Sequence, residues 1–393
     1  MTNEFRSNFP ILNQSSSPNP LIYLDSGATT LKPQSVIDSI VSYYTHYSSN
    51  IHRGRHSLSE YVSELYEYSV RDIANYFNSY QEEIIFTSGA TDSLNILATA
   101  LPDSIQRFLI LDHEHNSLIA PFMNSRHVFM RPGCVASDIS LDYLSRLIHE
   151  IKPDCFAFSH ASHISGHIQD VSKICRLLRS LGVLSLVDAS QSAMHNITDV
   201  KLMDCDFLVA SGHKMCGPTG IGILFIRSSH LPSISQFRCG GGGIVDVSTT
   251  TVSFKRSPFN LVSGTPHIAG VIGLASATRF LSEHSSQTTA TTQQLSRFLS
   301  QSEFGDDLIS IHSTSSNSLP ILTLIPVSKI FDSDTIAIMA SEKMNIMMRS
   351  GLHCAHAFFN SINYRDSLRL SASSYNTITD LSIARDFLRS NWC

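Results

Sequence analysis

Short apolar runs alternate along this chain with longer segments of helical periodicity. The runs are rich in isoleucine, leucine, valine and phenylalanine, and helical patterns at residues 93–101, 141–151 and 171–181 lie between several of them. Such alternation predicts an α/β fold, a mostly parallel sheet with helices on both faces. Ligands on these sheets bind outside the carboxyl ends of the strands. The predicted strands cover residues 83–87, 108–111, 156–158, 184–187, 207–210 and 221–226.

The chain is long enough for more than one domain. Its 393 residues exceed what one simple core usually supports, which predicts a large domain and a smaller one. After the last predicted strand, a helix at residues 268–284 leads into the polar stretch 285–292 and a second α/β-like segment. We place the large domain at residues 22–275 and the small domain at residues 276–393, joined by the N-terminal arm 1–21.

Composition excludes several classes of function. Hydrophobic residues make up 42% of the chain and the formal charge is -5, so nucleic acid and anionic membranes are poor partners. No apolar run reaches the roughly 18 residues of a membrane helix, and the polar N-terminus with Glu4 resembles no signal or transit peptide. The eight cysteines form no C-x-x-C pair, which favours a reduced, cytoplasmic protein over a disulfide framework. The tetraglycine 240–243 matches no phosphate-loop spacing and is predicted to be a mobile loop.

Lys214 follows directly after the predicted strand 207–210, within the segment 211–220 (SGHKMCGPTG). A lysine at a strand end, among small residues, can bring its amine to a cofactor held close to the backbone. Carbonyl chemistry through a Schiff base needs such an amine, partly desolvated and fixed in place. For an isolated lysine a surface turn would be the commoner interpretation, so the functional one depends on the other segments.

Two further strand ends suit an anion and a heteroaromatic ring. Residues 88–92 follow a strand and open a helix, where backbone N–H groups and a hydroxyl can face an anion; an ordinary capped helix start is the alternative. Asp188 and Gln191 end another strand. An aspartate there can keep a heteroaromatic nitrogen protonated, as a pyridoxal cofactor requires, and helix capping is the alternative.

Histidines and an arginine provide further candidates. Residues 112–116 place two histidines after a third strand, but their spacing lacks a clear third ligand and we predict no metal. Arg369 lies between apolar residues, which suits two-pronged capture of a carboxylate by a guanidinium held in a wall. A structural salt bridge is the alternative role of Arg369.

The segment 349–356 contains the most informative cysteine. Cys354 is flanked by glycine, histidines and an arginine, an electropositive setting that favours a thiolate nucleophile. A lone cysteine is more often a small buried hydrophobe, which fits Cys155 and Cys175. The polar neighbours of Cys354 argue against that interpretation.

Together these segments resemble a cysteine desulfurase of the SUF type, in the class V aminotransferase group of pyridoxal-phosphate enzymes. The resemblance covers residues 23–380, and its most specific parts are Ser-Gly-His-Lys followed by Gly-Pro-Thr-Gly-Ile-Gly (211–222) and Arg-Ser-Gly-Leu-His-Cys (349–354). Residues 24–29 and 52–59 are also similar to that family. The resemblance implies fold type I, with a seven-stranded, mostly parallel sheet in the large domain.

The resemblance also implies how pyridoxal 5'-phosphate is held. Lys214 would bind the cofactor covalently, Asp188 would pair with its pyridine nitrogen and Gln191 with its phenolic oxygen. His115 would stack on the ring and take part in proton transfer. Thr265 would reach the phosphate of the partner subunit, which implies a homodimer with shared active sites. The phosphate would be bound by Ala90, Thr91, Ser211 and His213.

On the substrate side the resemblance assigns Arg369 and Ala28 to substrate binding and Cys354 to sulfur acceptance. Two residues depart from the family pattern. His163 stands where the family usually has an asparagine that contacts both cofactor and substrate, and histidine is bulkier and titratable. Leu352 replaces a residue that is often histidine, which removes one local positive charge.

The expected reaction converts L-cysteine to L-alanine and leaves a persulfide on Cys354, with Lys214 and His115 managing protons. Delivery to a sulfur-acceptor protein and iron–sulfur cluster assembly would follow from the resemblance. The alternatives are another class V enzyme, such as a selenocysteine lyase, a C–S lyase or an epimerase, and a catalytically weak sulfur carrier. The last would be favoured by His163.

Overall fold

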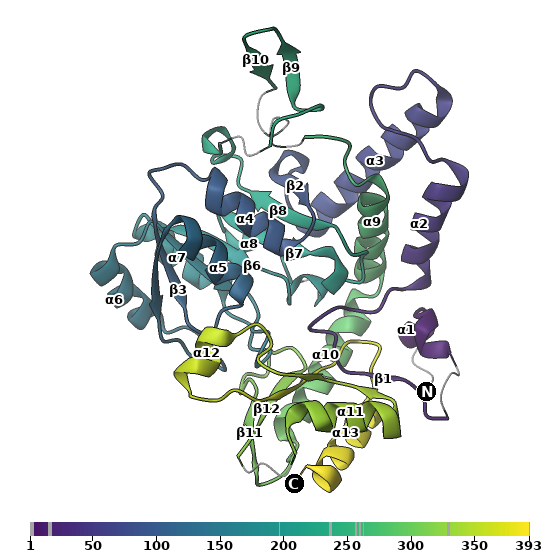
Figure 1. Cartoon of the computed structure of the whole chain (residues 1–393), viewed down its shortest axis with the longest axis vertical. Helices are drawn as coiled ribbons and strands as arrows, with labels where there is room; N and C mark the ends of the chain where they lie inside the picture. The colour runs from purple at the N-terminus through teal and green to yellow at the C-terminus, as the bar shows by residue number, and fades with distance from the viewer. Residues whose placement is uncertain are drawn as a thin grey trace.

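The computed structural model describes residues 4–14, 18–195, 197–235, 238–255, 258, 261, 263–327 and 331–392. Cys393 lies outside these residues. Figure 1 shows a large α/β part above a smaller one, with the segment between α9 and α10 connecting them. The predicted α/β fold, with its large and small sheets, is confirmed.

The large sheet has seven strands in the order β2-β8-β7-β6-β5-β3-β4. Pairing is parallel from β7 to β4, whereas β8 runs antiparallel to both β2 and β7. All six predicted strands are present, but β4 was not predicted. It is an edge strand of half-buried and exposed residues, so it lacks an apolar run. The bounds are β2 Ile84–Thr87, β3 Arg107–Leu111, β4 His127–Arg131, β5 Cys155–Ser159, β6 Leu184–Asp188, β7 Phe207–Ser211 and β8 Gly222–Ile226.

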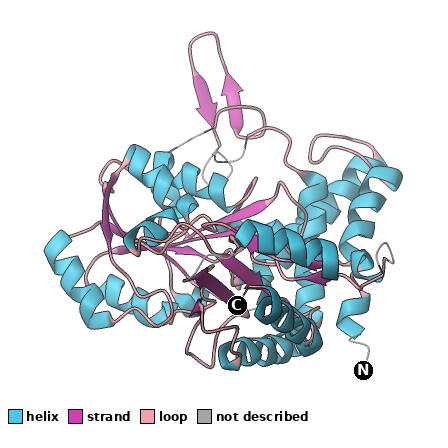
Figure 2. Ribbon diagram, turned by 60° about the horizontal axis from the view of Figure 1, so that its bottom comes forward, coloured by secondary structure: helices cyan, strands magenta, loops and turns pink. Residues whose placement is uncertain are grey.

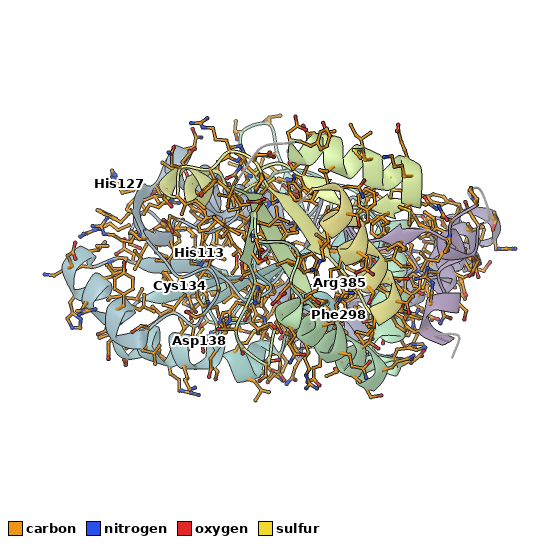
Figure 3. All side chains as sticks on the ribbon, turned by 90° about the horizontal axis from the view of Figure 1, so that it is seen from below. His113, His127, Cys134, Asp138, Phe298 and Arg385 are labelled. Carbon is orange, nitrogen blue, oxygen red and sulfur yellow. The ribbon has the colours of Figure 1, made fainter. Side chains whose placement is uncertain are left out.

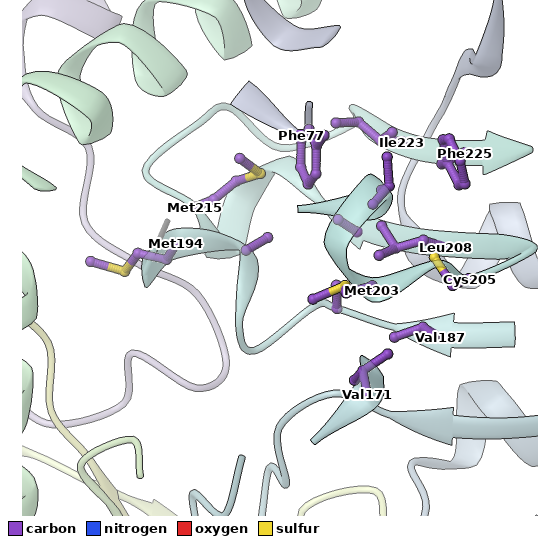
Figure 4. Packing of buried hydrophobic residues seen from close by; sticks show 14 of the residues in the cluster. Phe77, Val171, Val187, Met194, Met203, Cys205, Leu208, Met215, Ile223 and Phe225 are labelled. Carbon is purple, nitrogen blue, oxygen red and sulfur yellow. The ribbon is translucent and has the colours of Figure 1, made fainter. Parts of the chain in front are cut away.

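Helices cover both faces of this sheet because alternate residues of each strand point to opposite sides. In β5, Phe156 and Phe158 belong to one buried cluster, and Cys155 and Ala157 to the other. Figure 4 shows part of the first cluster, in which Val187, Leu208 and Ile223 of neighbouring strands lie with Met194, Met203 and Met215 from the segments between the strands. Each such large side chain, when fully buried, contributes roughly 1.5–3 kcal/mol.

The helices follow the predicted patterns closely. The helix α6, Leu141–Ile151, buries Leu144, Leu147, Ile148 and Ile151, a spacing that places them on one face. Ser140 caps it by accepting a hydrogen bond from the Tyr143 backbone N–H. The other helices on the sheet or beside it are α2 Gln34–His46, α3 Ser57–Tyr76, α4 Ala90–Ala100, α5 Asn116–Ser125, α7 Val171–Ser180, α8 Val200–Met203 and α9 Ile268–Glu283.

The smaller part contains a four-stranded sheet in the order β11-β12-β15-β14, and the short N-terminal strand β1 pairs with β13. In Figure 3, Phe298 of α10 and Arg385 of α13 lie side by side, and the guanidinium carbon is 5.5 Å from the ring centre. The bounds are α1 Glu4–Ser7, β1 Ile22–Tyr23, α10 Ser285–Gln301, β11 Leu308–Ile311, β12 Ile321–Pro326, α11 Ser333–Met344, β13 Ile346–Met347, β14 Arg349–Ser350, α12 His356–Ser361, β15 Leu368–Ser371 and α13 Ile378–Asn391.

The polar stretch 285–292 forms the first half of α10, a helix that the sequence pattern did not reveal. Thr288 and Thr292 lie on its buried face in line with Leu295 and Leu299. Threonines in these positions hide the helical period because they count as polar in a hydropathy pattern.

A hairpin formed by β9, Ile244–Val247, and β10, Val252–Phe254, projects from the large part, at the top of Figure 1 and again in Figure 2. Val245, Val247, Val252 and Phe254 are all exposed on it. The tetraglycine 240–243 forms turns that lead directly into β9. Its predicted mobility stays a prediction.

Across the described residues, none of the helices combines the length and the apolar character that a membrane crossing requires.

Candidate active site

One cavity lies at the carboxyl ends of the strands, where the large part meets the small one. Loops after β2, β3, β5, β6 and β7 supply its walls on the large side, and β14, β15 and the cysteine loop complete it. The polar segments that follow the predicted strands therefore meet at this edge of the sheet. Every predicted site residue except Thr265 lines this cavity, namely Ala28, Ala90, Thr91, His115, His163, Asp188, Gln191, Ser211, His213, Lys214, Cys354 and Arg369.

Lys214 ends the short turn Gly212–Lys214 that follows β7. A Cβ at Gly212 would lie 2.9 Å from the Ile221 carbonyl oxygen, so only glycine permits this close return of the chain. Burial lowers the pKa of the Lys214 amine to about 8, and the negative charges of Asp188 and Cys354 oppose this shift. A substantial neutral fraction of the amine is therefore present near physiological pH, as a nucleophile or base requires.

Asp188 and Gln191 stand beside the lysine at the end of β6. The Asp188 carboxylate is buried and accepts a hydrogen bond of 2.9 Å from the Ser190 backbone N–H. The Gln191 amide donates to the Gly27 carbonyl over 2.8 Å, which ties the N-terminal loop to the strand end. The Asp188 carboxylate is thus held in place in the lining of the cavity.

The start of α4 is surrounded by hydroxyl groups. The Ala90 backbone N–H donates to the Ser211 hydroxyl over 2.9 Å, and the hydroxyls of Thr91 and Ser117 lie 2.9 Å apart. Three separate segments therefore bring hydroxyls to the positive end of one helix, an arrangement that suits a phosphate. A Cβ at Gly222 would lie 2.4 Å from the Gly89 Cα, which shows how tightly β8 supports this turn.

His115 caps α5, because its Nδ1 accepts a hydrogen bond from the Ser117 backbone N–H over 3.1 Å. Nδ1 therefore carries no proton, and in the neutral ring the proton resides on Nε2. Burial, followed by the charge of Lys214, lowers the pKa of His115 to about 4, so the ring is neutral at physiological pH. His115 thus offers the cavity one N–H donor.

His163 occupies the cavity wall next to His115, with ring centres 5.0 Å apart and an edge-to-face geometry. Burial lowers the pKa of His163 well below its usual value. Its Nε2 is buried and has no hydrogen-bond partner among the described residues. An unpartnered buried nitrogen indicates that a ligand completes this position.

Glu114 was not predicted, although it lies between the two predicted histidines. It is buried and accepts hydrogen bonds from both the backbone N–H and the hydroxyl of Ser159 at the end of β5. Burial raises the pKa of Glu114 to about 7, and the charge of Asp188 adds to the shift. This carboxyl group fastens the loop that carries His115 to the neighbouring strand.

Two arginines form the opposite wall. Arg349 and Arg369 lie directly opposite each other in the β14–β15 pair, and both line the cavity. Arg369 is only 2% exposed; its Nη1 donates to the His163 carbonyl over 3.1 Å, and its Nη2 lies 3.3 Å from Asp25. Nε of Arg369 has no partner within the described part of the chain. Facing like charges are unfavourable without an anion, so this pair suits a carboxylate.

Gly27 packs closely against the Arg369 guanidinium in this wall. A Cβ there would lie 3.1 Å from Nη2 of Arg369, so a side chain would press on the guanidinium. The salt bridge considered for Arg369 from sequence exists with Asp25, but the free Nε leaves the arginine able to bind a carboxylate as well.

The cysteine loop has an unusual backbone. Gly351, His353 and Cys354 all have positive φ angles, of 97°, 49° and 61°. For the two residues with a Cβ, this conformation costs roughly 1–2 kcal/mol each. The loop is held by contacts on both sides: His353 is buried with Nε2 3.1 Å from the Ser367 hydroxyl, and Leu352 packs against a cluster that contains Phe358. Leu352 thus has a packing role where the family often has histidine.

The remaining cysteines within the described residues divide into exposed and buried ones. Cys134 and Cys239 are exposed, whereas Cys155, Cys175, Cys205 and Cys216 are buried. Burial raises the pKa of Cys175 to about 12 and of Cys216 to about 11, and it raises those of Cys155 and Cys205 well above the usual value. The prediction that Cys155 and Cys175 are buried hydrophobes is confirmed.

Thr265 is exposed and stands outside the cavity, just before α9. No group of three histidine, cysteine, aspartate or glutamate side chains is placed to hold a metal ion in the part of the chain that the structure describes. Several residues that line the cavity were not predicted as site residues, namely Gly27, Ser117, Ser159, Ala161, Ser190, Arg349 and His353.

Comparison with known proteins agrees with this geometry. Residues 22–383 match the Aminotransferase class-V family. The chain is 30% identical over 389 residues to a probable cysteine desulfurase of Vibrio cholerae, covering 96% of this chain and 95% of that protein. It is 31% identical over 388 residues to a cysteine desulfurase of Escherichia coli, covering 95% and 93%. A solved cysteine desulfurase from Thermococcus onnurineus superposes with a TM-score of 0.91 at 27% identity, covering 98% of this chain and 97% of that one.

The fold and the family match define the class: the chain belongs to the class-V aminotransferase family. Enzymes of this family depend on pyridoxal phosphate. The two relatives above, each similar to this chain over nearly its full length, are named as a probable cysteine desulfurase and a cysteine desulfurase.

Proposed function

We propose that this protein is a cysteine desulfurase, which converts L-cysteine to L-alanine and holds the released sulfur as a persulfide on Cys354. The observation that carries the proposal is that the Lys214 amine and the Cys354 thiol line one cavity beside the Arg349–Arg369 pair. Full-length relatives named as cysteine desulfurases support it.

The cavity residues fit pyridoxal 5'-phosphate. The hydroxyls and N–H groups at the start of α4, with Ser211 and His213, suit its phosphate, and the Asp188 carboxylate suits a protonated pyridine nitrogen. Gln191 and the unpartnered Nε2 of His163 suit the ring oxygen, and Lys214 suits the aldehyde carbon. When bound, the cofactor supplies an electron sink for negative charge at the substrate Cα.

The protein's own groups orient the substrate and move its protons. Arg369, assisted by Arg349, binds the carboxylate, with Ala28 beside it. The Lys214 amine, whose pKa of about 8 leaves part of it neutral near physiological pH, removes the Cα proton and later returns a proton to carbon. His115 would lie against the cofactor ring, and it offers its Nε2 proton to the cavity because Nδ1 accepts from the Ser117 backbone N–H.

Sulfur transfer takes place at Cys354. The thiolate attacks the substrate sulfur, the new S–S bond forms, and the C–S bond breaks with its electron pair passing to the carbon fragment. That fragment takes up a proton and leaves as alanine, so no external oxidant or reductant is needed. The persulfide then passes to a thiol acceptor, which we place in cytoplasmic iron–sulfur cluster assembly of the SUF type.

The test is a single turnover with limiting L-cysteine and no acceptor thiol. We expect alanine and protein-bound sulfane sulfur to appear in equal amounts, with the sulfur on the peptide that contains Cys354. Alanine without sulfane sulfur on the Cys354 peptide would contradict the proposal, and pyruvate with sulfide would indicate a C–S lyase instead.

We further propose a homodimer with shared active sites. Thr265 is exposed rather than in its own cavity, as a residue that serves a partner's phosphate would be. The projecting hairpin β9–β10 exposes four apolar side chains, which suits a subunit contact. We retain the division into a large domain, 22–275, and a small domain, 276–393 with the arm 1–21, as a proposal.

Another class V activity is the second candidate, and His163 is the observation that favours it. Changing His163 to asparagine restores the family residue, whose smaller amide offers both a donor and an acceptor. We expect kcat/KM for L-cysteine to rise about threefold, less than 1 kcal/mol of transition-state stabilisation. Steady-state alanine production measures this, with His160→Asn, a buried histidine outside the cavity lining, as control. A collapse of activity would assign His163 a specialised role in a different reaction.

A further inference from the structure

The loop that bears Cys354 is fastened to the large part through Asn116, the first residue of α5. The Asn116 backbone N–H donates to the Cys354 carbonyl over 2.7 Å. The Asn116 side chain makes two more bonds to the loop: its Nδ2 lies 2.8 Å from His356 Nδ1, and its Oδ1 accepts from the His356 backbone N–H over 3.3 Å. Asn116 therefore forms hydrogen bonds to the residues on both sides of Ala355, and one of these residues is Cys354 itself.

The side-chain bonds join Asn116 to His356, which lies 240 positions later in the chain. Asn116 directly follows His115 at the start of α5. The same short segment therefore positions both the histidine that we assign to the cofactor ring and the residue that holds the cysteine loop. His353 and Cys354 both have left-handed backbones, which residues with a Cβ leave readily unless surrounding bonds hold them. Other contacts also hold the loop: His353 Nε2 lies 3.1 Å from the Ser367 hydroxyl, the Ala355 backbone N–H donates to the Leu352 carbonyl over 2.8 Å, and Ala355 is buried just before α12. Asn116 adds bonds from the large part to both Cys354 and His356.

We infer that Asn116, together with His356, is a positioning residue that locks the Cys354 thiol at the sulfur-accepting position. The role as sulfur acceptor rests on the proposed function, but the lock itself does not. Without the lock the loop relaxes, the thiol leaves the cavity and becomes more accessible to solvent, and sulfur transfer slows while substrate binding at Arg369 continues.

The test uses the cofactor-loaded enzyme with Asn116→Ala and His356→Ala. Asn116→Ala removes both side-chain bonds and keeps the backbone bond to Cys354, whereas His356→Ala removes only the ring bond. We expect the rate at which iodoacetamide alkylates Cys354, followed by peptide mass spectrometry, to rise about fivefold in Asn116→Ala and less in His356→Ala. We expect kcat for alanine formation to fall about tenfold, with KM within twofold of the wild type.

Two further variants make the outcome decisive. Asn360→Ala, on the same exposed face of α12, is the matched control and should change neither rate. His356→Gln, whose amide oxygen can still accept from Asn116, should restore most of the activity, and the double variant should match Asn116→Ala because the two side chains act as one unit.

Unchanged alkylation in Asn116→Ala would overturn the inference, whatever happens to kcat, since the thiol would then be held by other contacts. If the wild type forms no alanine, the proposed function fails, yet the alkylation rates still decide whether the lock exists.

Discussion

Replacing Lys214 with alanine is expected to lower alanine production from L-cysteine by about 10⁴-fold, since both the covalent anchor and the proton carrier at Cα are removed. The amine is enclosed beside Asp188 with a pKa of about 8, and the other charged groups of the cavity cannot take its place. Arg369 remains protonated, and His115 is neutral with Nδ1 engaged at the start of α5. The loss should therefore appear in kcat rather than in KM alone.

Absorption spectroscopy provides a second measurement for the same variant. The wild type should be yellow, and Lys214→Ala should lose the visible band and release the cofactor on gel filtration. Lys173→Ala, on the exposed surface of α7, is the control and should behave as the wild type. If Lys214→Ala kept both the visible band and turnover, the assignment of the lysine would be wrong.

Replacing Cys354 with serine is expected to separate cofactor chemistry from sulfur transfer. The hydroxyl is a far weaker nucleophile towards sulfur than a thiolate, so persulfide formation should be lost and alanine production should fall about 10³-fold. The visible absorption should be unchanged, because the residues suited to the cofactor are all elsewhere in the cavity.

Further measurements on Cys354→Ser distinguish a desulfurase from a lyase or an epimerase. If the enzyme is a desulfurase, Cys354→Ser should still deprotonate L-cysteine, detected as exchange of the Cα hydrogen with deuterated water. Cys134→Ser and Cys239→Ser, which change two exposed cysteines, are the controls. Full alanine production by Cys354→Ser would favour a lyase or an epimerase, reactions that do not require the thiol.

The sequence predicts best those residues that directly follow an apolar strand. Lys214, Asp188 and His115 each follow a buried strand of a parallel sheet, and strand ends on one edge of such a sheet meet. The position of each residue along the chain thus already implies its neighbours in space. The resemblance to a known family then added the roles that spacing alone left open.

Residues whose role depends on long-range pairing were not predicted. Arg349 matters because the register of β14 and β15 places it opposite Arg369, and no local pattern encodes that register. Glu114 matters because Ser159 of another strand donates two hydrogen bonds to it. Strand β4 and the first half of α10 were missed for a simpler reason, since edge exposure and buried threonines remove the apolar signal.

Four buried thiols limit where sulfur can accumulate in this protein. Cys155, Cys175, Cys205 and Cys216 stay protonated at neutral pH, and a protonated thiol without solvent access neither attacks a sulfur donor nor exchanges with one. Excess substrate therefore cannot convert the protein interior into a polysulfide store. The cargo remains at the protein–solvent boundary, where another molecule can collect it.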